Sequence, residues 1–169
     1  IQRAKNLRAL EDALPQIPNE SFFYHWSRND FSRWLFARTE IVLASDLRPA
    51  TAEDFEYNVG DMKRYLYTHI RDQRRRRLTG VVVNFDPVDF DLETEIFKIG
   101  TGSLGGKARG LAFFSNMLGD HIHFLEQYKS VKIFVPQTLV ITTKGFDAFI
   151  ETNSLEYLSK VDMPDEEVA

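Results

Sequence analysis

The spacing of apolar residues changes at Gly80, and this change constrains the fold more than any other feature of the sequence. Before Gly80, apolar residues recur every three or four positions, as on one face of a helix. After it come short β-branched runs separated by polar and glycine-rich stretches. The sequence therefore predicts a mixed α+β chain in two parts. Residues 1–79 form a helical lead segment, and residues 80–169 form an α/β unit.

The helical part is expected to contain three long helical segments. Apolar spacing predicts a helix over residues 2–14 and a second helical zone over residues 21–47. Thr51 followed by Asp54 resembles a capping box and predicts the start of a third helix, which continues to Gly80. The apolar face of that helix comprises Phe55, Val59, Met62, Leu66 and Ile70.

Two groups of side chains in the helical part each allow two interpretations. The arginines at 74–77 could bind phosphate or nucleic acid, but a net charge of -4 argues against nucleic acid, so we interpret them as a solvated helix end. A group of aromatic residues could form either a core or a docking surface for a partner domain. These residues are Phe22, Phe23, Tyr24, Trp26, Phe31 and Trp34.

The second part is expected to hold short strands that alternate with helices. The strands are predicted at 81–83, 96–99, 131–135 and 139–142. The helices are predicted at 107–118 and 143–151, with 121–128 as a further helix or turn. The glycine-rich stretch 100–106 would then connect a strand to a helix.

This stretch fits neither of two common phosphate-binding motifs. A Walker A loop would need a glycine where Thr101 stands and a hydroxyl where Ala108 stands. The spacing of Gly100, Gly102 and Gly105 does match the dinucleotide fingerprint. However, no acidic residue ends the next predicted strand, where such a residue would hold the ribose.

Two interpretations of the glycine stretch remain. In one, glycine amides at Gly102, Gly105 and Gly106 surround an anion, Lys107 adds a positive charge, and Thr101 and Ser103 add hydroxyls. Arg109, two residues later, could also reach a phosphate or could lie on the exposed side of its helix. In the other interpretation the stretch is a tight strand-to-helix turn, and its glycines only permit close packing.

Two blocks with matching order and spacing carry a family resemblance. GSLGGKARGLAFFSNML followed by VPQTLVITTKGFDAFIETN resembles the start of the nucleotide-binding domain of the pyruvate phosphate dikinase and phosphoenolpyruvate synthase family. The resemblance covers residues 96–153. Matching residues are Gly105, Gly106, Lys107, Leu111, Pro136, Thr142, Thr143 and Phe149. Gln137 and Thr138 depart from the Pro-Gly of the common pattern.

The resemblance implies an incomplete ATP-grasp-like domain and, in the intact protein, binding of ATP with Mg²⁺. The implied phosphate-binding residues are Gly102, Ser103, Gly105, Gly106, Lys107 and Arg109. In the family, phosphate passes from ATP through an enzyme histidine to pyruvate, giving phosphoenolpyruvate. No histidine here, namely His25, His69, His121 or His123, has the matching context, so no catalytic residue is assigned.

The resemblance also implies that this sequence is part of a longer cytoplasmic polypeptide. Alone, it is expected to be catalytically inactive and to bind ATP weakly. Its helical segment would pack against another domain of the same polypeptide. The alternative is a regulatory or protein-interaction module in which the glycine stretch has no catalytic role.

Other features of the sequence exclude some kinds of site. The chain has no cysteine, which excludes disulfides and cysteine-ligated metals. No apolar run approaches the roughly 20 residues of a membrane span, so no membrane partner is expected. His121 and His123 could ligate a metal, but we interpret them as ordinary surface residues and assign no metal ligand. Asp86, Asp89 and Asp91 are interpreted as turn residues.

Overall fold

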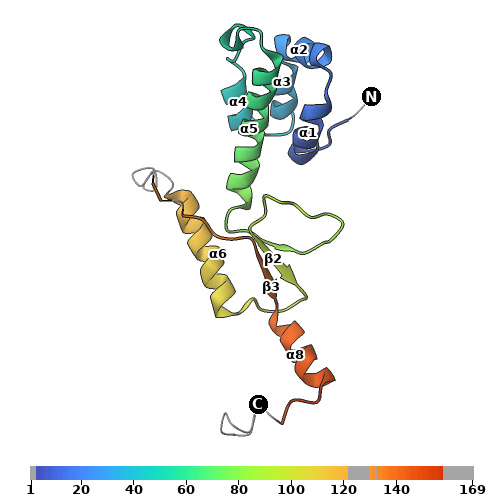
Figure 1. Cartoon of the computed structure of the whole chain (residues 1–169), viewed down its shortest axis with the longest axis vertical. Coiled ribbons are helices and arrows are strands. Elements are labelled where there is room, and N and C mark those ends of the chain that lie inside the picture. Colours follow the sequence, from blue (N-terminus) through green and yellow to red (C-terminus); the bar gives the residue numbers. More distant parts are fainter. Residues whose placement is uncertain (1–2, 122–129, 132, 158–169) are drawn as a thin grey trace. The chain divides into compact units, whose positions relative to one another are not determined.

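A computed structural model describes residues 3–121, 130–131 and 133–157. The chain divides into two compact units, Ile1–Arg77 and Leu78–Ala169, which we name the helical unit and the sheet unit. The helical unit contains only helices, and the sheet unit combines helices with a small parallel sheet (Figure 1). This confirms the predicted mixed α+β class. None of the described helices is both long and apolar enough to cross a membrane.

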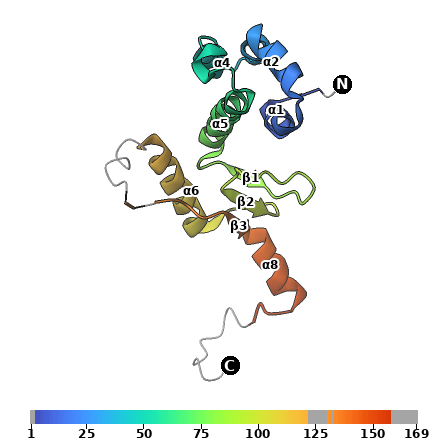
Figure 2. The same ribbon diagram turned by 45° about the horizontal axis from the view of Figure 1, so that its top comes forward.

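The helical unit contains short helices followed by one long one (Figures 1 and 2). In chain order they are α1 (Leu7–Ala13), the 3-10 turn η1 (Leu14–Gln16), α2 (Asn19–Ser27), α3 (Asp30–Phe36), α4 (Ile41–Leu47), the 3-10 turn η2 (Glu53–Phe55) and α5 (Val59–Leu78). The first helix therefore begins five residues later than predicted, at Leu7. The Asn6 side chain caps it by accepting a hydrogen bond from the Ala9 N–H at 2.8 Å.

The single helical zone predicted over residues 21–47 is wrong, because the chain bends twice within it. Asn29 and Thr39 adopt the left-handed backbone conformation, with φ of 57° and 62°. A residue in this conformation cannot continue a right-handed helix, so the zone is divided into α2, α3 and α4. The prediction of helix from apolar spacing nevertheless holds on either side of each break, where α2, α3 and α4 form.

The predicted start of the long helix is also wrong, although the predicted contact forms. Thr51 donates from its N–H and its hydroxyl to Asp54 Oδ2, at 2.7 and 2.9 Å, and these bonds hold the pKa of Asp54 below its ordinary value. They stabilise η2 rather than α5. Asn58 caps α5 instead, because its Oδ1 accepts from the N–H groups of Gly60 at 2.9 Å and Asp61 at 3.3 Å.

One apolar cluster forms the core of the helical unit. Phe22, Leu35 and Met62 are fully buried within it, and Trp26 is nearly so. The rings of Phe22 and Trp26 stack with centroids 5.7 Å apart. The aromatic residues are therefore mainly core, although Tyr24 is 56% exposed.

The interpretation of residues 74–77 as a solvated helix end is wrong for Arg74, whereas the Arg77 side chain is 52% exposed and also forms an ion pair. Arg74 is buried and forms an ion pair with Glu11 of α1. Arg77 donates two hydrogen bonds, both 2.6 Å long, to the carboxylate of Glu40, which precedes α4. These pairs connect α5 to the shorter helices of its own unit.

The sheet unit contains three parallel strands in the order β1-β2-β3. The strands are β1 (Val82–Asn84), β2 (Ile96–Ile99) and β3 (Thr138–Ile141), and the helices are α6 (Gly105–Asp120) and α8 (Thr143–Thr152). The strand predicted over 131–135 is wrong for its described residues, which have no strand structure. Of the predicted segment 121–128, all but His121 lies outside the described residues.

Different parts of the chain cover the two faces of this sheet (Figures 1 and 2). Ile96 and Phe97 are neighbours in β2, so their side chains point to opposite faces, and both are buried. Phe97 stacks on Phe90 of the loop between β1 and β2, with ring centroids 4.8 Å apart. On α6, the buried Ser115 hydroxyl donates to Glu95 just before β2. These contacts join the loop between β1 and β2, and the second half of α6, to β2 or the residue just before it.

Candidate functional site

The glycine stretch lies at the carboxyl ends of the parallel strands. Residues 100–104 link the end of β2 to the start of α6, and β3 passes directly into α8 beside them (Figure 1). Because β2 and β3 are parallel neighbours, both helices begin at the same edge of the sheet. This edge is where α/β proteins commonly bind ligands.

Hydrogen bonds join the glycine stretch to the start of α8. The Ser103 N–H donates to Thr143 Oγ1 at 3.1 Å, and the Thr143 N–H donates to the Ser103 carbonyl at 2.9 Å. The fully buried Thr142 donates from its hydroxyl to the Thr101 carbonyl at 3.2 Å. The first half of the stretch is therefore fixed against residues 142–144.

Gly100 and Gly102 allow this close approach. A Cβ at Gly100 would lie 2.8 Å from Thr142 Oγ1, and a Cβ at Gly102 would lie 3.1 Å from both Thr143 Oγ1 and Lys144 Cγ. Both glycines also have positive φ, at 88° and 128°. Close packing therefore explains these two glycines, and the phosphate contact predicted for Gly102 remains a prediction.

Gly105 and Gly106 have a different environment, because a Cβ at either position would meet no atom within 4 Å. They form the first turn of α6, whose N-cap residue forms no side-chain capping bond. The Gly105 N–H reaches Ser103 Oγ only at 3.4 Å. Among the described residues, the N–H groups of Gly106 and Lys107 have no hydrogen-bond acceptor. We name residues 105–107 the open turn.

Basic side chains lie at the open turn and beside the glycine stretch that precedes it. Lys107 is exposed, and Arg109 donates from Nε to the Gly105 carbonyl at 3.3 Å, so it folds back along the start of α6. Lys144, in the first turn of α8, was not predicted from the sequence. Its only sequence signal was its position directly after the Thr142-Thr143 pair of the second block.

The side chains gathered here are hydroxyls and cations, which suit an anionic ligand. Within residues 3–121, 130–131 and 133–157, no group of three or more His, Asp or Glu side chains could hold a metal ion. His123, the second residue of the possible histidine pair, lies outside the described part of the chain.

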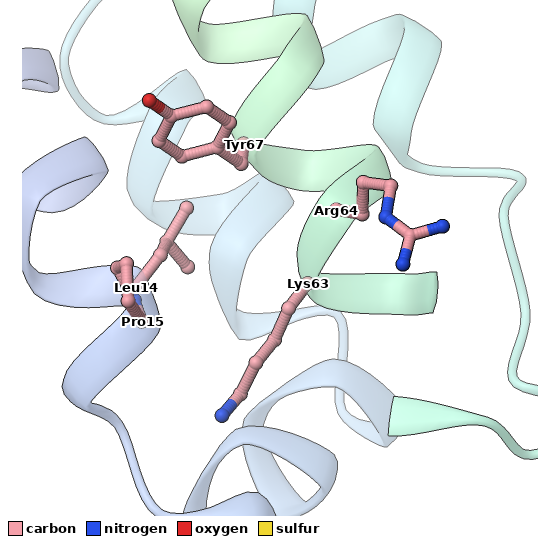
Figure 3. A pocket seen from close by; sticks show the side chains of 5 residues that line it. All are labelled: Leu14, Pro15, Lys63, Arg64 and Tyr67. Atoms are coloured by element: carbon pink, nitrogen blue, oxygen red, sulfur yellow. The ribbon is translucent and has the colours of Figure 1, made fainter. Parts of the chain in front are cut away.

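The helical unit carries a hollow of its own, lined by Leu14, Pro15, Lys63, Arg64 and Tyr67 (Figure 3). The Lys63 ammonium group donates to the Ile17 carbonyl at 2.6 Å and to Asn19 Oδ1 at 2.9 Å. Its charge therefore stabilises the turn before α2.

Comparisons of the chain with protein-family models, curated proteins and solved structures gave no match. The candidate site accordingly depends on its own geometry and on the two sequence blocks described above.

Proposed function

We propose that the open turn binds the phosphates of ATP and belongs to an ATP-grasp-like nucleotide-binding unit. The observation that carries this proposal is the space around Gly105 and Gly106 at the start of a 16-residue helix. Nothing in the described chain fills this space, while the glycines at Gly100 and Gly102 are packed against other residues. Gly105 also has a φ of 73°, which by itself favours glycine, so the open space at Gly106 is the more specific signal.

The physical basis of binding is the combination of backbone donors and a lysine. The first N–H groups of a helix carry partial positive charge and lack partners within the helix, so they favour an anion. Lys107 adds a full positive charge beside them. Each charge-assisted hydrogen bond to a phosphate contributes about 1.5–3 kcal/mol, and residues 105–107 can supply several.

We propose that the intact protein is a phosphoenolpyruvate synthase-like phosphotransferase that acts in the cytoplasm. Phosphate would pass from ATP through an enzyme histidine to pyruvate, and Mg²⁺ would accompany the nucleotide. The contribution of the described residues is to bind and orient the ATP phosphates. Lys107 would reduce the negative charge on the phosphoryl group being transferred.

Titration of ATP into the chain and into the Lys107→Ala variant tests this function. Lys5→Ala is the matched control, because Lys5 is also exposed but belongs to the helical unit. We expect Lys107→Ala to weaken ATP binding about tenfold, the effect of losing one charged hydrogen bond, and Lys5→Ala to leave it unchanged. Equal ATP affinity in all three proteins would contradict the proposed role of Lys107.

A second candidate is a protein-interaction module, in which the helical unit binds a partner. Exposed apolar side chains on α3 and α4 favour it, since Phe36, Ile41 and Val42 are each more than half exposed. In this case ATP would not bind specifically at residues 105–107. The Lys107→Ala titration therefore separates the two candidates.

A further inference from the structure

We propose that the outer faces of α3 and α4 bind a partner protein through an acidic amphipathic helix of that partner. The surface consists of Phe36, Ile41 and Val42, with Arg33 and Arg38 at its edge, and we name it the α3–α4 surface. The inference adds the chemistry of the partner to the second candidate function. It concerns the helical unit alone, so it is independent of ATP binding in the sheet unit.

A tight turn brings the apolar side chains of the surface together. The Glu40 N–H donates to the Leu35 carbonyl at 3.1 Å. The Thr39 N–H donates to the Phe36 carbonyl at 3.0 Å, and Thr39 has the left-handed conformation. These features form a Schellman motif, which ends α3 sharply. Ile41, the first residue of α4, therefore lies near Phe36, the last residue of α3.

Both helices already bury a different face in the core of the helical unit. The buried side chains are Ser32 and Leu35 on α3, and Leu43, Ala44 and Leu47 on α4. The Ser32 hydroxyl donates to the Ala44 carbonyl at 2.9 Å, so these buried faces meet. Phe36, Ile41 and Val42 lie outside the core and are each more than half exposed. Helices with apolar side chains on opposite faces usually bury both, so the outer faces indicate a docking partner.

The charges around the surface favour an acidic partner. Arg33 lies one turn before Phe36, and its side chain is 73% exposed. Arg38 lies in the turn, with its guanidinium 3.8 Å from the centre of the Trp34 ring, which holds this charge in place. Residues 1–77 contain 14 of the 21 basic residues but only 11 of the 25 acidic ones, which gives this unit +3 in a chain of net charge -4.

The acidic side chains near these arginines balance them only in part. Asp30 lies 3.7 Å from Arg33, and its other oxygen is hydrogen-bonded to His25 at 2.9 Å. Glu40 is buried and already forms an ion pair with α5. Asp46 is the only acidic residue of α4 and lies near the end of that helix. Carboxylates on a partner would therefore complement the positive edge of the surface.

The composition of the surface favours a protein over a membrane. Three exposed apolar side chains on two seven-residue helices present too little apolar area to hold a chain at a lipid surface. An apolar centre with a charged rim is instead the usual anatomy of a protein interface. The described part of the helical unit offers no strand edge, so a partner segment must dock by its side chains, as an amphipathic helix does.

Fluorescence anisotropy of labelled peptides titrated with the full chain tests the inference. The probe is a designed amphipathic helix with leucines on one face and glutamates on the other. Two counterparts carry glutamine or lysine in place of glutamate. We expect the glutamate peptide to bind at least about fivefold more tightly than the glutamine peptide, because each exposed ion pair contributes up to about fivefold. The lysine peptide should bind most weakly, and added salt should reduce these differences.

Variants of the chain, each checked for folding by circular dichroism, locate the binding surface. We expect Phe36→Ala to weaken binding of the glutamate peptide about tenfold, because aromatic anchors dominate interfaces. Tyr57→Ala is the control, since Tyr57 is also more than half exposed but lies outside the surface. Arg33→Glu should abolish the preference for glutamate over glutamine. Arg64→Glu should keep it, because the exposed Arg64 lies on α5.

The other possible occupants give different results. Sedimentation of the chain alone detects a second copy on the surface, and binding to phosphatidylserine vesicles detects a membrane. Either kind of binding, if Phe36→Ala abolishes it, would contradict the acidic-helix partner. Failure of the glutamate peptide to bind, equal affinity for the three peptides, or equal effects of Phe36→Ala and Tyr57→Ala would also overturn the inference. Lys107→Ala should bind the glutamate peptide like the wild-type chain, so these results leave the ATP proposal untouched.

Discussion

The four glycines of the strand-to-helix connection differ in their surroundings, although Gly100, Gly102 and Gly105 all have positive φ. Gly100 and Gly102 are needed because the chain passes close to Thr142, Thr143 and Lys144. Gly105 and Gly106 face open space at the start of α6. The sequence suggested both a packing role and an anion-binding role for this stretch. The structure shows where close packing applies, and the anion-binding role remains a proposal for the other pair.

Alanine substitutions at Gly102 and Gly106 should have opposite consequences for stability. Gly102→Ala places a Cβ near Thr143 and Lys144 at a φ of 128°, so we expect a loss of about 1–3 kcal/mol. Gly106→Ala meets no atom, and alanine favours the helix, so we expect no loss or a gain of about 0.5 kcal/mol. Urea denaturation of both variants checks this. Equal destabilisation by the two substitutions would contradict the division into pairs.

Removing one partner of the buried ion pair should destabilise the helical unit. Glu11→Ala leaves Arg74, which is 9% exposed, without its carboxylate, so we expect a loss of about 3 kcal/mol. Asp61→Ala is the control, because the Asp61 pair with Arg64 is exposed and should cost less than about 1 kcal/mol. Thermal unfolding measures both. A loss after Glu11→Ala as small as that of the control would show that the pair contributes little.

At the scale of elements, apolar spacing predicted where helices occur better than where they begin and end. The strand β2 was predicted with its observed bounds, Ile96–Ile99, because a short apolar run stands alone between polar segments. The breaks at Asn29 and Thr39 were missed, since the left-handed conformation at these residues depends on contacts that spacing does not encode. The start of α5 was missed because two capping signals, at Thr51 and Asn58, lie close together.

The two capping signals can be distinguished by mutation. Asn58→Ala removes the acceptor for the first N–H groups of α5, so we expect a loss of about 1 kcal/mol from the helical unit. Thr51→Ala removes only the hydroxyl bond to Asp54 in η2 and should have a smaller effect. Chemical denaturation of both variants provides the measurement. A larger loss of stability in Thr51→Ala than in Asn58→Ala would contradict the assignment of Asn58 as the cap of α5.

At the scale of the whole molecule, the two units differ in how much of their apolar surface is buried. The helical unit has a continuous core that includes one face of α5. In the sheet unit, α8 has no buried residue, and its Phe146 and Phe149 are 63% and 57% exposed. Such differences in burial produce differences in local stability within one chain.

Hydrogen exchange of the full chain should reveal this difference. We expect the central amides of α5, near Leu66 and Ile70, to exchange at least about a hundredfold more slowly than those of α8, because burial of one helix face opposes local opening. Exchange measured by mass spectrometry or NMR provides the comparison. Similar protection in the two helices would mean that α8 has a covering partner in solution.

The site could be predicted only in part from the sequence. The residues of the open turn are contiguous, so a motif search finds Gly105, Gly106 and Lys107 together. Lys144 lies 37 positions after Lys107, and it meets the glycine stretch only because β2 and β3 are parallel neighbours. Strand pairing of this kind is a long-range contact that no local pattern specifies.

The central claim is that the open turn binds phosphate, and the most direct measurement is of its own amide signals. In NMR titration of the ¹⁵N-labelled chain with ATP at millimolar concentrations, we predict saturable shifts of the Gly106 and Lys107 amides. In Lys107→Ala these shifts should need about ten times more ATP to saturate, while the amides of the helical unit stay in place. Unchanged signals at Gly106 and Lys107, or shifts confined to the arginines of α5, would contradict the claim.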